Sequence, residues 1–253
     1  MASSLLTVVR DLQRPRGRER RELTLAEGVR LVEEAVARGI EITGAVVSPA
    51  LEKGDRGVAL LESLSRNNTR IERVSDKDLA EIADTEHPQG VVAIVRPRQW
   101  AFKDLDIVRN PAVLVLDGIQ DPGNVGTLLR TAQGLGAAGV VALPGTVELT
   151  NPKVVRGSMG ALFSLPSVVA GPDDFTAWCK ERQLPLIIAA ADGEPLGRSP
   201  LPRPAGIVLG NEGAGVSPAL RKAGRAVAIP LASGTESLNV AVAGGILLFE
   251  VLK

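Results

Sequence analysis

The order of hydrophobic and polar positions divides the chain near residue 96. In the first part, apolar positions at helical spacing alternate with short apolar runs. Thr24 and Glu27 have the spacing of a capping box and predict a helix over residues 24–39. Further helices are predicted over residues 51–66 and 75–84, and strands over residues 44–48, 69–74 and 89–95. This alternation predicts a small layered α/β domain over residues 1–95.

The second part of the chain has the pattern of a buried parallel sheet. It follows a stretch from Arg96 to Pro111 whose prolines and mixed charge predict a linker over residues 96–110. Near-continuous Val, Ile and Leu runs predict strands over residues 112–117, 139–143, 185–190, 206–210 and 226–230. Helices are predicted over residues 124–136, 151–163 and 173–183. We therefore expect a parallel sheet flanked by helices, followed by an apolar last helix that is buried in the domain or against another subunit.

Length and charge favour two domains and restrict how the protein would recognise a nucleic acid. The 253 residues include 29 Lys and Arg against 29 Asp and Glu, so the formal charge cancels. Aromatic residues make up only 2% of the chain. This composition is not typical of a protein that coats nucleic acid through its overall field or stacks bases on exposed rings. A local nucleic-acid site remains open.

Cys179 and His87 are the only residues of their kinds. Cys179 therefore has no internal disulfide partner, and we expect no metal because a Cys/His zinc site cannot be assembled. His87 precedes Pro88 outside every motif described below, so we expect a loop histidine and not a catalytic base. No apolar run reaches the roughly 20 residues of a membrane span, and the first residues lack a signal-peptide pattern. We expect a cytoplasmic protein.

Polar residues and glycines follow the first strand of the predicted parallel sheet. The motif DGIQDPGNVGTLLRTA (117–132) makes a tight loop that leads into a helix, the usual ligand position in an open α/β sheet. Asn124 and Arg130 are six residues apart, and we expect them on roughly the same side of this helix. A helix-capping asparagine and a surface arginine would also explain the two residues.

Two later strand ends carry similar chemistry. In IVLGNEGAGVS (207–217), glycines let the backbone approach a ligand closely. The spacing is wrong for a dinucleotide fingerprint, and Glu212 would repel a pyrophosphate. In VAIPLASGTESLNVAVAGG (227–245), Ser237 and Asn239 precede the last helix, where capping alone would account for them. Capping does not explain why three strand ends each combine Gly with Asn, Glu or Ser.

Together the three motifs resemble those of the SpoU/TrmH family, RNA ribose 2′-O-methyltransferases of the SPOUT class. The resemblance rests on N-V-G-x-x-x-R from Asn124, L-G-N-E-G from Leu209 and I-P…S-L-N-V from Ile229. It covers about residues 111–253 and implies a methyltransferase domain there with a C-terminal trefoil knot. Residues 1–95 are similar to the ribosomal-protein-like substrate-binding domain of the family. A homodimer through the C-terminal domain is also implied.

The resemblance implies S-adenosylmethionine as the cofactor and assigns residues to the site. The expected cofactor-binding residues are Leu209, Gly210, Gly213, Ile229, Pro230 and Leu238. The expected catalytic residues are Arg130, Asn124, Glu212, Ser237 and Asn239. Because an arginine stays protonated in proteins, Arg130 acts either as an unusual base or by binding the adjacent phosphate and stabilising the developing alkoxide.

An arginine-rich arm offers a local RNA-binding surface. Six arginines lie between Arg10 and Arg21, and we expect RNA contacts from Arg14, Arg16 and Arg18, unless the arm is only a solvated segment. The family resemblance adds Arg156 and Ser158 as RNA contacts. Ribosomal RNA is the expected substrate, with transfer RNA as the alternative. A non-catalytic RNA-binding or ribosome-assembly protein of the same fold, and a nucleotide-binding oxidoreductase, are the competing interpretations.

Overall fold

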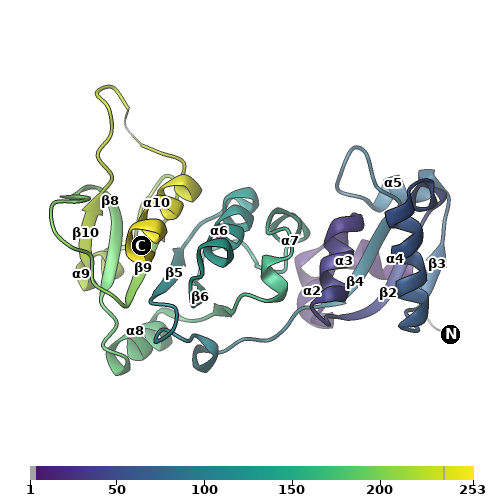
Figure 1. The fold of residues 1–253 in the computed structure, drawn as a ribbon, viewed down its shortest axis with the longest axis horizontal. Coiled ribbons are helices and arrows are strands. Elements are labelled where there is room, and N and C mark those ends of the chain that lie inside the picture. Colours follow the sequence, from purple (N-terminus) through teal and green to yellow (C-terminus); the bar gives the residue numbers. More distant parts are fainter. Residues whose placement is uncertain (1–3, 236) are drawn as a thin grey trace. The chain divides into compact units, whose positions relative to one another are not determined.

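The computed structural model of the chain describes residues 4–235 and 237–253, which form two compact units (Figure 1). Unit 1 combines Met1–Arg98 with Glu148–Ser164, and unit 2 combines Gln99–Val147 with Leu165–Lys253. The segment Glu148–Ser164 lies between the first two motifs in sequence, where we expected the second domain. Because this segment packs within unit 1, the chain passes between the units after Arg98, Val147 and Ser164.

Unit 1 contains a mixed four-stranded sheet. Its strand order is β1 (Thr24–Glu27), β4 (Val91–Arg96), β2 (Glu41–Val47) and β3 (Ile71–Arg73), and only β2 and β3 are parallel. The accompanying α-helices are α1 (Leu5–Leu12), α2 (Pro15–Arg21), α3 (Val29–Ala37), α4 (Asp55–Arg66), α5 (Asp76–Ile82) and α7 (Pro152–Gly157). Short 3-10 turns, η1 (Pro49–Lys53) and η3 (Ala161–Phe163), complete the unit. The small α/β domain predicted from the sequence is present.

One local prediction in unit 1 was wrong. The helix predicted to begin at Thr24 begins at Val29, because residues 24–27 form β1 and pair antiparallel with β4. Ladder hydrogen bonds and burial of this strand outweigh the capping-box pattern. The arginine-rich segment, for which a solvated segment was the alternative, is helical, since α1 buries one apolar face and leads into α2. The helix predicted from residue 75 is present as α5, and Ser75 caps it through a capping box with Asp78.

Unit 2 contains the parallel sheet expected from its apolar runs. The strand order is β10 (Arg225–Ala228), β8 (Leu186–Pro195), β9 (Ala205–Gly210), β5 (Ala112–Asp117), β6 (Gly139–Ala142) and β7 (Ser167–Val169), with every neighbouring pair parallel. Its helices are η2 (Phe102–Asp104), α6 (Pro122–Leu135), α8 (Pro172–Glu181), α9 (Pro218–Ala223) and α10 (Val240–Leu252). The predicted fold class, α/β with a parallel sheet flanked by helices, is confirmed.

Alternate residues of the central strands pack against helices on opposite faces of this sheet. Val113 and Val115 of β5 share a buried cluster with Trp178 of α8 and Leu220 of α9. On the other face, α10 packs against α6, β5 and β9. The helix predicted over 151–163 is shorter than expected, since α7 ends at Gly157. The trefoil knot remains a prediction.

Helix α10 is apolar around most of its circumference but is only partly covered. Leu247, Leu248 and Val251 are fully buried, whereas Val242 and Phe249 are 52% and 56% exposed. The last helix therefore presents apolar side chains on its outer face. Among the described residues, no helix is long and apolar enough to cross a membrane.

Candidate functional site

The loops that follow β5 and β9 leave the same edge of the sheet in unit 2. Asp117 at the end of β5 lies opposite Gly210 at the end of β9 in the parallel register. The Asp117 carboxylate accepts a 2.7 Å hydrogen bond from the backbone N–H of Ser217, which closes the turn after β9. Parallel pairing therefore brings the first and second motifs together, although about 90 residues separate them in sequence.

The side chain of Asn211 builds the turn of the second motif. Its Oδ1 atom accepts hydrogen bonds from the N–H groups of Gly213 (3.0 Å) and Ala214 (2.9 Å). Its Nδ2 atom donates to the carbonyl oxygen of Gly118 at 2.9 Å, which ties the turn to the loop after β5. A Cβ atom on Gly210 would lie 2.1 Å from backbone atoms of this turn, so only glycine fits there.

Glu212 joins the second motif to the first. Its carboxylate accepts a 3.0 Å hydrogen bond from Nδ2 of Asn124 and longer ones from the backbone N–H groups of Gln120 (3.3 Å) and Asp121 (3.4 Å). Partial burial of Glu212 raises its pKa, but these hydrogen bonds outweigh the effect, so the pKa lies below its ordinary value. Glu212 is therefore an anionic acceptor at neutral pH.

Asn124 and Asn239 complete a chain of hydrogen bonds through all three motifs. The Asn124 Oδ1 atom accepts from Nδ2 of Asn239 at 2.9 Å. Asn239 also caps α10, because its Oδ1 atom accepts from the N–H groups of Ala241 (2.9 Å) and Val242 (3.4 Å). The capping interpretation of Asn239 is thus correct but incomplete. The same side chain connects the third motif to Asn124 and, through it, to Glu212.

A cavity of about 470 Å³ opens beside this chain of hydrogen bonds. Its lining includes predicted catalytic and cofactor-binding residues: Asn124, Leu209, Gly210, Glu212, Ile229, Ser237, Leu238 and Asn239. The predicted cofactor residues Gly213 and Pro230 are not among the lining residues. Sequence reasoning missed Asn211, Leu247 and the alanines at positions 189–191 of β8. The run of small residues at the end of the strand predicted over residues 185–190 could have indicated that these alanines line a cavity.

Arg130 does not reach this cavity within its own chain. It lies on α6 and is exposed, and its side chain has no hydrogen bond or ion pair among the described residues. The expectation that Asn124 and Arg130 share one side of the helix was wrong, because six residues turn an α-helix by about 600° and leave the side chains about 120° apart. The cavity of a single chain therefore lacks the predicted catalytic arginine.

The arginines predicted to bind RNA differ in their surroundings within unit 1. Arg14 and Arg16 are exposed and have no ion pair among the residues that the structure describes. Arg18 is only 4% exposed and forms a 2.6 Å ion pair with Glu148. The prediction for Arg18 therefore requires correction, since its buried guanidinium is used inside the protein and does not face solvent.

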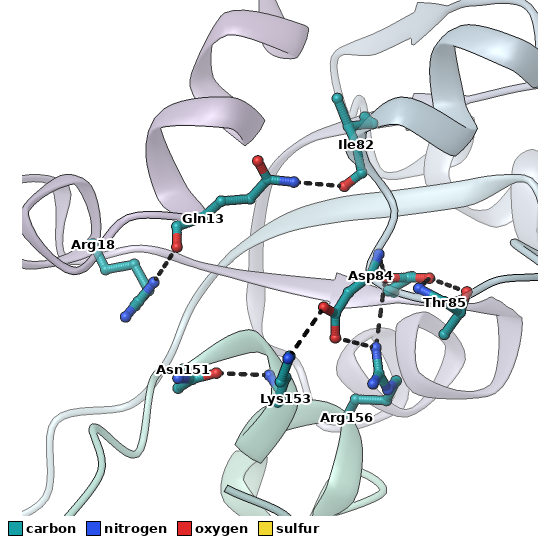
Figure 2. A network of polar contacts seen from close by, with 9 residues as sticks. Gln13, Arg18, Ile82, Asp84, Thr85, Asn151, Lys153 and Arg156 are labelled. Atoms are coloured by element: carbon teal, nitrogen blue, oxygen red, sulfur yellow. Dashed lines mark hydrogen bonds and ion pairs between the residues drawn. The ribbon is translucent and has the colours of Figure 1, made fainter.

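Arg156 and Ser158 belong to the segment that packs within unit 1. Arg156 donates a 2.6 Å hydrogen bond to Asp84, and Lys153 lies 3.9 Å from the same carboxylate (Figure 2). Ser158 is 1% exposed, and its hydroxyl donates to the carbonyl oxygen of Val155. The structure thus places Ser158 out of reach of RNA, whereas Arg156 is partly exposed and paired with a carboxylate.

The lone cysteine and histidine remain outside the cavity. Cys179 on α8 is buried, and burial raises the pKa of its thiol to about 12, which is unsuitable for a nucleophile. His87 is exposed in unit 1. Within residues 4–235 and 237–253, no group of three or more His, Cys, Asp or Glu side chains is placed to hold a metal ion.

Comparison with known proteins identifies the family. Residues 111–249 match the SpoU rRNA methylase family, and residues 7–93 match the MRM3-like substrate binding domain. The 23S rRNA (adenosine(1067)-2′-O)-methyltransferase of Streptomyces azureus is 31% identical over 250 residues, which cover 95% of this chain and 89% of that protein. The 23S rRNA (guanosine(2553)-2′-O)-methyltransferase of Bacillus subtilis is 31% identical over 239 residues, covering 90% and 87%.

A solved structure extends this similarity to the fold. The AdoMet complex of the SpoU methyltransferase AviRb from Streptomyces viridochromogenes superposes with a TM-score of 0.85 at 28% identity, covering 99% of this chain and 98% of that one. The chain belongs to the SpoU rRNA methylase family. The resemblance that its three motifs indicated is confirmed.

Proposed function

We propose that this protein transfers a methyl group from S-adenosylmethionine to a ribose 2′-hydroxyl of ribosomal RNA. The observation that carries the proposal is the chain of hydrogen bonds Asn239–Asn124–Glu212 at the edge of the cavity. It draws one side chain from each of the three motifs, and family membership connects these motifs with 2′-O-methylation. The relatives named above act on 23S rRNA, which favours ribosomal over transfer RNA as substrate.

The cavity has the properties that an adenosine-containing cofactor needs. Its walls are mainly apolar, and Gly210, which has no side chain, is one of the lining residues. Leu209, Gly210, Ile229 and Leu238 would hold S-adenosylmethionine, which supplies an activated methyl group when it is bound. The sequence assignment of Gly213 and Pro230 to this role stays a weaker proposal, because neither lines the cavity. Gly213 instead supports the turn through Asn211.

Methyl transfer requires the 2′-hydroxyl to be held in line with the methyl group and to lose its proton. We assign the positioning to Asn124, Asn239 and Ser237, with Glu212 fixing the Asn124 amide through their 3.0 Å hydrogen bond. Ser237 is exposed at the cavity and is free to contact RNA. Arg130 would bind the neighbouring phosphate and stabilise the developing alkoxide, since a guanidinium remains protonated.

The position of Arg130 favours a homodimer that shares its sites. Arg130 is absent from the cavity of its own chain, while α10 exposes Val242 and Phe249. A second copy that covers this face of α10 would bury the apolar side chains and bring its own Arg130 to the cavity. Mixing inactive Arg130→Ala and Asn124→Ala chains should then restore part of the activity. No restoration after subunit exchange would contradict a shared site.

The two units receive different roles in this proposal. Unit 1 would bind RNA, with Arg14 and Arg16 as phosphate contacts and Arg156 as a further contact that exchanges Asp84 for a phosphate. Unit 2 would hold the cofactor and perform the transfer. A cytoplasmic location fits a ribosomal RNA substrate.

Labelled cofactor tests the proposal directly. Purified protein should transfer a radioactive methyl group from S-adenosylmethionine to protein-free 23S rRNA and not to transfer RNA. Glu212→Gln should lower the rate while leaving the protein folded. A wild-type protein that binds ribosomal RNA and cofactor but transfers no label to any ribosomal RNA would favour the non-catalytic alternative.

A further inference from the structure

We propose that the carboxylate of Glu212 accepts the proton that the ribose 2′-hydroxyl loses during methyl transfer. The inference rests on the proposed function, in which no residue yet takes this proton. Arg130 cannot take it, because a guanidinium stays protonated in proteins and has no free site for a further proton. A second residue is therefore needed for this step.

The cavity of unit 2 offers a single proton acceptor. Of the described residues that line it, Glu212 alone has a side chain that titrates. The other polar side chains of the lining are carboxamides and a hydroxyl, which take up no proton at neutral pH. They belong to Asn124, Asn211, Ser237 and Asn239. The composition of the lining therefore favours Glu212 as the acceptor.

The hydrogen bonds of Glu212 leave room for a substrate hydroxyl. Its Oε1 atom accepts from Nδ2 of Asn124 at 3.0 Å and from the N–H of Asp121 at 3.4 Å. From the described residues its Oε2 atom accepts only one hydrogen bond, at 3.3 Å from the N–H of Gln120. A carboxylate has about four lone-pair sites, so Oε2 keeps an open one. Because Glu212 is exposed at the cavity, a ribose hydroxyl can donate to Oε2.

The same contacts keep the acceptor ionised beside the residue assigned to hold the ribose. Partial burial raises the pKa of Glu212, but the side-chain donor of Asn124 and the backbone donors outweigh it and leave the pKa below its ordinary value. Glu212 is therefore deprotonated at neutral pH. One carboxylate thus contacts Asn124 through Oε1 and has Oε2 available for the proton.

The proton transfer follows from the bonding changes of the reaction. An electron pair of the 2′-oxygen forms the bond to the methyl carbon, while the bond between this carbon and sulfur breaks and its electron pair stays on sulfur. The oxygen gains positive charge as it bonds to carbon, so its proton becomes far more acidic than that of a free alcohol. A carboxylate with a lowered pKa is a sufficient acceptor at this stage, and the resulting carboxylic acid returns the proton to solvent.

The Glu212→Gln variant separates proton transfer from support of Asn124. The glutamine carbonyl can still accept from Nδ2 of Asn124, but it cannot take up the proton. Single-turnover transfer to 23S rRNA at neutral pH should be at least about 100-fold slower than in wild type, the usual size of general-base catalysis. Glu181→Gln, which removes an exposed carboxylate from α8, is the charge control and should transfer at the wild-type rate. A Glu212→Gln variant that keeps the wild-type rate would overturn the inference.

Chemical rescue of Glu212→Ala adds a matched comparison. Formate supplies a carboxylate that can take the proton, whereas formamide supplies only a neutral acceptor for the Asn124 amide. Formate should raise the transfer rate of Glu212→Ala by about tenfold or more, and formamide should not. Equal rescue by both compounds, or none by formate, would overturn the inference. A loss in Glu236→Ala that formate restores would do the same, since it would assign the proton to the carboxylate that precedes Ser237 in the sequence.

Calorimetry tests the competing role, in which the carboxylate attracts the positive sulfonium of the cofactor. Glu212→Gln should bind S-adenosylmethionine, and S-adenosylhomocysteine with its uncharged sulfur, as tightly as wild type does. Weaker binding of S-adenosylmethionine alone would assign the carboxylate to the sulfonium and overturn the inference. If the wild-type chain methylates no ribosomal RNA, the proposed function itself fails. If wild type is active and Glu212→Gln keeps its rate, only this inference fails.

Discussion

Replacing Asn239 by alanine and by aspartate separates two roles of one side chain. Asn239 Oδ1 caps α10, and its Nδ2 atom donates to Asn124 at 2.9 Å. Asn239→Ala removes both functions. Asn239→Asp keeps the acceptor that caps the helix but replaces the donor by an oxygen that faces Oδ1 of Asn124. Asn124 cannot reverse its amide to compensate without losing its 3.0 Å hydrogen bond to Glu212.

The expected magnitudes follow from these contacts. Loss of the cap in Asn239→Ala should lower the free energy of unfolding by about 1 kcal/mol, equivalent to about 2–4 °C in Tm. Asn239→Asp should preserve most of this stability, because a carboxylate caps well and interacts favourably with a helix N-terminus. Loss of the Asn124 contact, with repulsion between the facing oxygens, should lower kcat about tenfold or more in both variants.

Thermal unfolding and single-turnover methyl transfer to 23S rRNA measure the two effects independently. Calorimetry with S-adenosylmethionine serves as the control that each variant retains a formed cavity. The Asn239→Asp variant should keep most of the wild-type thermal stability and transfer the methyl group more slowly than wild type. A stable Asn239→Asp variant with the wild-type rate would refute the reasoning and leave Asn239 as a helix cap only.

Three further predictions concern binding, pH and the thiol. Replacing Arg14 and Arg16 together by alanine should lower the salt slope of RNA binding by about 1.5–2, with cofactor affinity unchanged; an unchanged slope would remove both from the RNA surface. The pKa of Glu212 lies below its ordinary value of 4.5, so activity that depends on its carboxylate should persist at neutral pH and be lost only as the pH falls below 4.5. A pH profile of kcat with a Glu212-dependent midpoint above 4.5 would contradict this lowered pKa. The thiol of Cys179, with a pKa of about 12, should resist iodoacetamide at about pH 8 until the protein is unfolded, as mass spectrometry would record; rapid labelling of active protein would contradict its burial.

Apolar periodicity was sufficient to predict the sheet of unit 2. The runs at 112–117, 206–210 and 226–230 correspond closely to β5, β9 and β10, because strands buried on both faces need continuous apolar side chains. In unit 1 the same approach failed at Thr24–Glu27. Its capping-box spacing is a local signal, whereas its strand is stabilised by pairing with β4 about 70 residues later.

The sequence was sufficient to select the motifs of the candidate site, but not the hydrogen bonds and ion pairs that connect their residues. Asn124, Glu212 and Asn239 were selected from the sequence. The structure joins the first two because β5 and β9 are neighbours, and it adds Asn239 because α10 packs against α6. The role of Asn211 was missed, since a carboxamide that braces a turn resembles any loop asparagine in sequence. The burial of Arg18 was also missed, because its partner Glu148 is 130 residues away.

The chemical form of the product tests the central claim most directly. Ribosomal RNA methylated with radioactive cofactor is hydrolysed in alkali, which cleaves every linkage except the one that follows a 2′-O-methylated ribose. The account predicts that the label appears in a single alkali-resistant dinucleotide and that Asn239→Asp and Glu212→Gln reduce its yield. Label recovered in mononucleotides as a methylated base would contradict it. So would a yield of the labelled dinucleotide from both variants that equals the wild-type yield.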